Sequence, residues 1–125
     1  MIVDTIKIEN NNIEAIYKNI STYLFDNNIV NNKSLIYDEF IQREKIGSIK
    51  IYDDMYLPHI VSSNILINSI LRIVGSKFKV LFILVRENTD NTKFFNVVNA
   101  LLEREFVDRI FSCPNNEFKD IIIKI

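Results

Sequence analysis

The sequence predicts an α/β fold in which a mixed β-sheet is flanked by helices on both faces. Residues 78–85 are apolar at almost every position, which is typical of a central strand covered on both faces. Between Ile13 and Leu24 the apolar residues recur every three or four positions, as on the buried face of a helix. The predicted order is one strand, two helices, several strands and then helices. With 125 residues and no linker or internal repeat, we expect a single domain over residues 1–125.

The first part of the chain is predicted to form one strand and two helices. Residues 2–8 alternate in part and are rich in β-branched side chains, which favours a half-buried strand. Asparagines at 10–12 can cap the helix that starts at Ile13. Residues 31–34 open the second helix, and Gly47 stands where a left-handed residue would end it.

The middle of the chain is predicted to be rich in strands. A short strand is expected over residues 48–52, with Ile49 and Ile51 on one face, and a turn follows it. Two β-rich runs, 65–74 and 78–85, are separated by a Gly-Ser step. This step suggests a tight hairpin between two neighbouring strands.

The last part of the chain is predicted to be helical. A helix is expected over residues 91–106, and a short helical segment over 107–111. A closing helix begins after Pro114. We interpret the apolar stripe of the 91–106 helix as part of the core: Phe94, Phe95, Val97, Val98, Leu101, Leu102 and Phe106.

Composition excludes several kinds of function. The net charge is −1 and there is no basic cluster, so direct binding of nucleic acid is not expected. No apolar stretch is long enough to span a bilayer, and we expect a cytoplasmic protein. Cys113 is the only cysteine, which leaves no internal disulfide and no structural zinc site. With two glycines there is no phosphate-binding loop, so no nucleotide cofactor is expected.

The only histidine, His59, is the candidate reacting residue. A neutral imidazole can accept and release a phosphoryl group near pH 7. Pro58 fixes its own φ and favours an extended backbone before it, so the histidine would be presented from a rigid segment. On residue type alone a structural histidine is the commoner interpretation. Ser62 and Ser63 lie nearby, but without an orienting acid they do not indicate a hydrolase triad.

Arg43 is the second candidate. It follows Phe40 by three positions and Ile36 by seven, and so lies on the helical stripe that faces the core. A guanidinium in that place requires an anionic partner. The alternative is a structural arginine that extends to solvent or favours the helix C-terminus by its charge.

The segments 40–48 and 57–59 together resemble one family of sugar phosphotransferase proteins. The first reads Phe-Ile-Gln-Arg-Glu-Lys-Ile-Gly-Ser and the second Leu-Pro-His. An Arg-Glu pair at a helix end, a Gly-Ser step and a Pro-His dipeptide at this separation resemble the phosphorylation site of enzyme IIA domains of the mannitol/fructose class. The pattern of strands and helices is similar along essentially the whole chain.

The resemblance implies a mannitol/fructose enzyme IIA-like fold and a phosphohistidine carrier. His59 matches the histidine that takes a phosphoryl group from phospho-HPr and passes it to a cysteine of a IIB domain. Arg43 matches the arginine that steadies the phosphoryl group. The implied partners are therefore HPr and a IIB domain, and the resemblance implies that no metal or nucleotide cofactor is required.

The chain departs from the family pattern at three positions. Ile60 follows the Pro-His pair where the family commonly has glycine, and Ile49 follows the Gly-Ser step where threonine is common. The family usually has a second histidine at the start of the helix after the central strand, and Phe94 is the matching position here.

Two functions follow from the resemblance. One is a phosphocarrier in sugar uptake. The other is the enzyme IIA-like domain of a sugar-responsive transcriptional regulator, in which phosphorylation is a signal and further domains would lie upstream of Met1. A degenerate binding domain that is not phosphorylated is a third, minor alternative.

Overall fold

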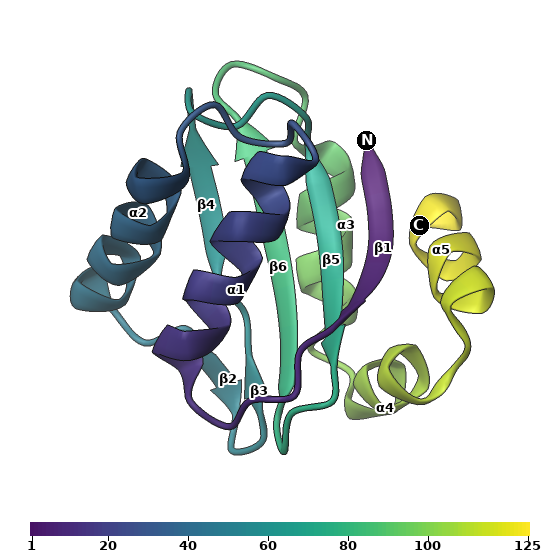
Figure 1. The fold of residues 1–125 in the computed structure, drawn as a ribbon. Coiled ribbons are helices and arrows are strands. Elements are labelled where there is room, and N and C mark those ends of the chain that lie inside the picture. Colours follow the sequence, from purple (N-terminus) through teal and green to yellow (C-terminus); the bar gives the residue numbers. More distant parts are fainter.

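The computed structural model describes all residues from 1 to 125 and contains one six-stranded β-sheet (Figure 1). Across the sheet the strands are β1 (Ile2–Lys7), β5 (Ser69–Val74), β6 (Lys79–Arg86), β3 (Met55–Tyr56) and β2 (Lys50–Tyr52). The remaining strand, β4 (His59–Ser62), pairs with β6 after β3. Parallel pairs are β1 with β5 and both β3 and β4 with β6, whereas β5–β6 and β2–β3 are antiparallel. The predicted mixed sheet is confirmed.

Helices cover both faces of this sheet, as predicted. The first pair, α1 (Ile13–Asp26) and α2 (Lys33–Ile46), lies in front of the sheet in Figure 1. Behind it lies α3 (Thr92–Ala100), while α4 (Arg104–Ser112) and α5 (Asn115–Lys124) lie beside β1. Each face has its own apolar core, one with α1 and α2 and the other with α3, α4 and α5.

The central strand is β6, and its side chains feed both cores. All six residues from Val80 to Val85 are buried. Because successive side chains of a strand point to opposite faces, they alternate between the cores. Val80, Phe82 and Leu84 pack with α1 and α2, and Leu81, Ile83 and Val85 pack on the other side. This explains why the sequence of β6 is apolar without interruption.

Asparagine caps begin the first two helices, as predicted. The side chain of Asn12 accepts a 3.2 Å hydrogen bond from the Ala15 amide at the start of α1. Asn32 does the same for the Leu35 amide of α2, at 2.9 Å. Each cap satisfies one of the amides that a helix N-terminus leaves without a partner.

Two expectations at the end of α2 and in the strand after it are wrong. Gly47 is extended, with φ 177° and ψ 169°, and does not adopt the left-handed conformation. Ile49 is buried, but Ile51 is 40% exposed, so the two do not share a face. Ile49 lies before β2, and the register between β2 and β3 shifts between Lys50 and Tyr52, which breaks the simple alternation.

The predicted hairpin is present, but its first strand is shorter and its connection longer than expected. β5 begins only at Ser69, because β4 and β5 flank β6 and the chain between them must cross the end of β6. Four residues, 75–78, join β5 to β6 in place of a two-residue turn. Gly75 has φ 103°, and a β-carbon there would lie 3.2 Å from the carbonyl oxygen of Ile8, so glycine is required.

The predicted 91–106 helix is interrupted, and its stripe is not all core. α3 ends at Ala100 and α4 starts at Arg104, with a tight turn between them. Within the stripe, Phe95 is 60% exposed and Leu102 is 76% exposed. Leu102 lies in the turn that follows α3, whereas Phe95 lies within α3 next to buried Phe94 and therefore points in another direction. The two helices after the interruption agree with the predicted short segment and closing helix.

A buried arginine ties the C-terminal helices to the sheet. Arg72 in β5 is 3% exposed, and its guanidinium donates to Thr5 Oγ1 at 3.0 Å. It also donates to the carbonyl oxygens of Ile110 and Cys113, both at 2.7 Å, and lies 4.7 Å from the centre of the Phe118 ring. The carbonyl end of α4 carries partial negative charge, which compensates the buried cation.

Candidate functional site

The backbone around Pro58 fixes the position of His59. The amide of Leu57 donates to the carbonyl of Ile49 at 2.7 Å, and the carbonyl of Pro58 accepts from the Ile83 amide at 3.0 Å. Pro58 therefore takes part in sheet pairing through its carbonyl, and its missing N–H is not needed. His59 follows as the first residue of β4, opposite Ile83 in the parallel register.

The turn before this segment is held by an ion-pair network around Asp54. Arg104 of α4 contacts both carboxylate oxygens of Asp54 at 2.7 Å, and Lys79 Nζ is 2.7 Å from Oδ2. The hydrogen bonds from Arg104, and then those from Lys79, hold the pKa of Asp54 well below its usual range. Tyr52 adds a 2.7 Å hydrogen bond from its hydroxyl to the Leu101 carbonyl. The β2–β3 segment that precedes His59 is thus bonded to the turn between α3 and α4 and to the start of α4.

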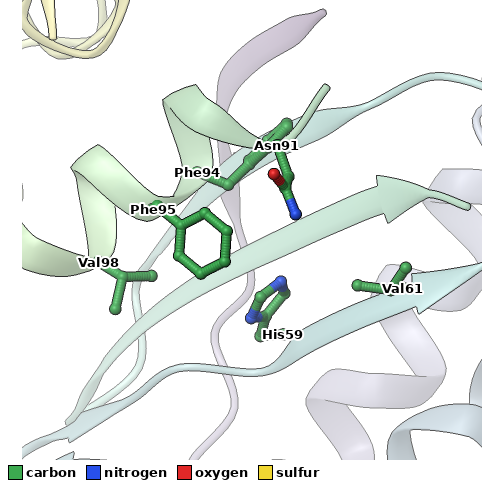
Figure 2. Close-up of a pocket in the computed structure, with 6 residues that line it drawn as sticks. All are labelled: His59, Val61, Asn91, Phe94, Phe95 and Val98. Atoms are coloured by element: carbon green, nitrogen blue, oxygen red, sulfur yellow. The ribbon is translucent and has the colours of Figure 1, made fainter. Parts of the chain in front are cut away.

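His59 is half-buried and lines an apolar hollow of about 210 Å³ between β4 and α3. The other residues that line it are Val61, Asn91, Phe94, Phe95 and Val98. Figure 2 shows the Phe95 ring between α3 and the imidazole. Burial, and secondarily the charge of Arg43, lowers the pKa of His59 below its ordinary value of 6.5. The imidazole is therefore neutral at pH 7, with a free lone pair on one ring nitrogen.

His59 also lines a second groove, together with Arg43 of α2. This groove, of about 240 Å³, is lined by Glu39, Gln42, Arg43, Ile46, His59, Ile60 and Val61. Arg43 is half-buried on the last turn of α2, and its Nη1 donates a 3.1 Å hydrogen bond to the Gly47 carbonyl. The structure therefore brings the two residues selected from the sequence to one groove.

The residue opposite His59 is not the one expected from the sequence. Phe94, the expected counterpart, is 3% exposed and belongs to the core beneath α3. Its neighbour Phe95 is exposed and lies over the imidazole (Figure 2). Sequence reasoning also missed Asn91 and Val61 as lining residues. The spacing of Val61 two residues after His59 in a strand could have placed both on one face.

The arrangement suits transfer of an anionic group to a nitrogen nucleophile. A neutral imidazole supplies the nucleophile, and a guanidinium supplies charged, directional donors on the adjacent groove wall. The apolar ring of Phe95 lies on the other side of the imidazole. None of the helices is long and apolar enough to cross a membrane.

Comparison with known proteins gives a family and a related fold. The sequence profile of the family described as "Phosphoenolpyruvate-dependent sugar phosphotransferase system, EIIA 2" matches residues 3–124. A solved structure, nitrogen regulatory protein IIA-Ntr from Neisseria meningitidis, is similar with a TM-score of 0.75 and 12% sequence identity. The similarity covers 96% of this chain and 91% of that one. No protein among the curated sequences matches the chain. Since the profile matches almost all of the chain, the protein belongs to the EIIA 2 family of the phosphoenolpyruvate-dependent sugar phosphotransferase system.

Proposed function

We propose that this domain is a phosphohistidine carrier of the mannitol/fructose class, acting in the cytoplasm. In this proposal His59 accepts a phosphoryl group from phospho-HPr and passes it to a cysteine of a IIB domain. The observation that carries the proposal is the pairing of a neutral, half-buried His59 with Arg43 in one groove. Family membership supports it, because EIIA domains take part in phosphoryl transfer.

The proposed chemistry needs no group beyond the partner proteins. The lone pair on a His59 ring nitrogen forms a bond to phosphorus as the nitrogen–phosphorus bond of the donor phosphohistidine breaks. The electron pair of that bond returns to the donor imidazole. In the second step a cysteine thiolate of IIB forms a sulfur–phosphorus bond, and His59 leaves as a neutral imidazole. In each step negative charge lies on the phosphoryl oxygens, where Arg43 can donate to them.

Exposed apolar residues around His59 support docking of protein partners. Val61 is 55% exposed beside it, and Phe95 lies across the hollow. A further apolar hollow of about 230 Å³ shares Val98 with the first and includes Leu102. Exposed apolar side chains that adjoin one another often mark protein interaction sites.

The test is phosphorylation by a reconstituted pathway. The domain is incubated with phosphoenolpyruvate, enzyme I and a cognate HPr, and its intact mass is measured. We expect an acid-labile gain of one phosphate in the wild type and none in His59→Ala. A persistent gain in His59→Ala would exclude His59 as the acceptor, and the absence of a gain in the wild type would favour the degenerate binding domain.

A regulatory IIA-like domain is the second candidate, and Phe95 favours it. A phenyl ring over His59 excludes water but offers no hydrogen-bond donor to a transferring phosphoryl group, so onward transfer should be slow. The similar fold of a protein named as nitrogen regulatory is consistent with such a role. A single-turnover chase of the phosphorylated domain with a cognate IIB separates the two, since a carrier transfers rapidly and a regulator slowly.

A further inference from the structure

The side chain of Asn91 is not used as a cap, although it occupies a cap position. Asn12 and Asn32 precede α1 and α2 with extended backbones and accept amide hydrogen bonds. Asn91 precedes α3 with φ −112° and ψ 11° and makes no side-chain capping bond. The amide at the start of α3 is bonded elsewhere, because Asp90 Oδ1 accepts from the Thr92 amide at 2.9 Å. The carboxamide of Asn91 therefore remains available.

This carboxamide lies in the hollow that contains His59. Figure 2 shows it extending from the start of α3 toward the imidazole. Apart from His59, the remaining lining residues are all apolar, namely Val61, Phe94, Phe95 and Val98. Asn91 is thus the only side chain on the α3 side of this hollow that can donate a hydrogen bond. Its place at the N-terminus of α3 also favours negative charge nearby.

We propose that the Asn91 side-chain amide donates a hydrogen bond to an oxygen of a phosphoryl group carried by His59. This inference rests on the proposed function of His59. Arg43 belongs to α2, and Asn91 precedes α3, on the opposite face of the sheet. His59 lines both grooves, so a phosphoryl group on its ring can be contacted from both sides. The Asn91 amide is neutral and can rotate to present its NH₂ group, which has two donors.

A hydrogen bond from Asn91 would be formed next to the apolar ring of Phe95. The ring shields the phosphoryl group from water, and a hydrogen bond is stronger where water is excluded. A donor beside an apolar shield can hold the phosphoryl oxygens in one orientation and slow their hydrolysis. We therefore expect the amide to speed formation of phospho-His59 and to lengthen its lifetime.

The test compares three variants of the whole chain by single-turnover phosphorylation from phospho-HPr. Asn91→Ala should be phosphorylated about tenfold more slowly than the wild type, because a hydrogen bond to a charged group is lost. Asn91→Asp has the same shape but places a carboxylate near the phosphoryl oxygens, so it should be slower still. Asn99→Ala removes an exposed asparagine from the same helix and should match the wild type.

A second measurement detects the contact directly. In ¹⁵N-labelled protein, phosphorylation should move one side-chain amide proton of Asn91 downfield, whereas those of Asn99 stay in place. If the wild type is phosphorylated while Asn91→Ala and Asn91→Asp react equally fast and the resonance does not move, the Asn91 contact alone is overturned. If the wild type accepts no phosphoryl group, both the proposed function and this inference are overturned.

Discussion

The hydroxyl group of Tyr17 in α1 donates a 2.9 Å hydrogen bond to Oε1 of Glu44 in α2. Glu44 directly follows Arg43, so the bond ties the last turn of α2 to α1. Burial, and then the hydrogen bond to Glu44, raises the pKa of Tyr17, which keeps the hydroxyl protonated as a donor. The position of Arg43 beside His59 therefore depends in part on a residue that lines neither groove.

Tyr17→Phe should lower the free energy of unfolding by about 1.5 kcal/mol, because it leaves the Glu44 carboxylate without its donor. The ring itself stacks on Phe40 with centroids 4.9 Å apart, and phenylalanine keeps that contact. Urea unfolding measures the change. Tyr37→Phe, which removes a hydroxyl from α2 outside this pair, is the matched control. An equal loss in both variants would contradict a specific role for the Tyr17–Glu44 bond.

Arg43→Lys should slow phosphorylation of His59 by about tenfold to a hundredfold while leaving the melting temperature unchanged. Lysine keeps the charge but loses the planar pair of donors, and one such contact to a charged group contributes roughly 1.5 to 3 kcal/mol. The rate of phosphorylation is measured by mixing each variant with phospho-HPr and quenching samples at set times. Arg109→Lys, on the exposed surface of α4, controls for a general effect of the substitution. A wild-type rate in Arg43→Lys would assign Arg43 a purely structural role.

Phe95→His should accelerate transfer from phospho-His59 to IIB, because it places a hydrogen-bond donor where the ring now lies over His59. Phe94→His would do so only if the register expected from the sequence were right. Since Phe94 is buried in the core, we expect that variant to lose stability by several kcal/mol instead. The single-turnover chase and thermal unfolding separate these outcomes. Faster transfer in Phe94→His than in Phe95→His would show that Phe94, as expected from the sequence, is the residue that faces His59.

The rate of phosphorylation should be constant around pH 7 and fall only below about pH 6.5. The nucleophile is the neutral imidazole, and burial together with Arg43 lowers the pKa of His59, so protonation begins at a lower pH than in a free histidine. Arg43→Gln removes the cation and should raise the pKa, although burial, the larger cause, remains. An NMR titration of the unphosphorylated imidazole measures both values. A wild-type pKa above 6.5, or a downward shift in Arg43→Gln, would be inconsistent with the structure.

The features that could be predicted from sequence are those set by local patterns. The asparagine caps of α1 and α2 and the apolar run of β6 each follow from a few neighbouring residues. The Pro58–His59 step and Arg43 were also found in this way, because a single histidine and a charged residue on an apolar stripe stand out. Both residues line one groove, as expected from the separation between the Arg-Glu pair and the Pro-His dipeptide in the sequence.

The features that were missed depend on where the chain changes direction. Helical periodicity continues through residues 91–106, so it gave no sign of the turn after Ala100. Within α3 the pattern also does not show which of two adjacent, chemically identical residues faces the core: Phe94 is buried and Phe95 is exposed. The pattern predicts Asn91 only as the first residue of a helix, since only the tertiary arrangement shows its amide beside His59.

The partners of Arg72 also set an order for folding during synthesis. The carbonyls that compensate its guanidinium come from Ile110 and Cys113, 38 and 41 residues later in the chain. A nascent chain that has emerged only through β6 must therefore leave this position of β5 hydrated, because an uncompensated cation is too costly to bury. A charge in an otherwise apolar strand also discourages pairing with other unfinished chains. Burial of Arg72 must therefore wait until α4 and the residue that follows it have reached the sheet.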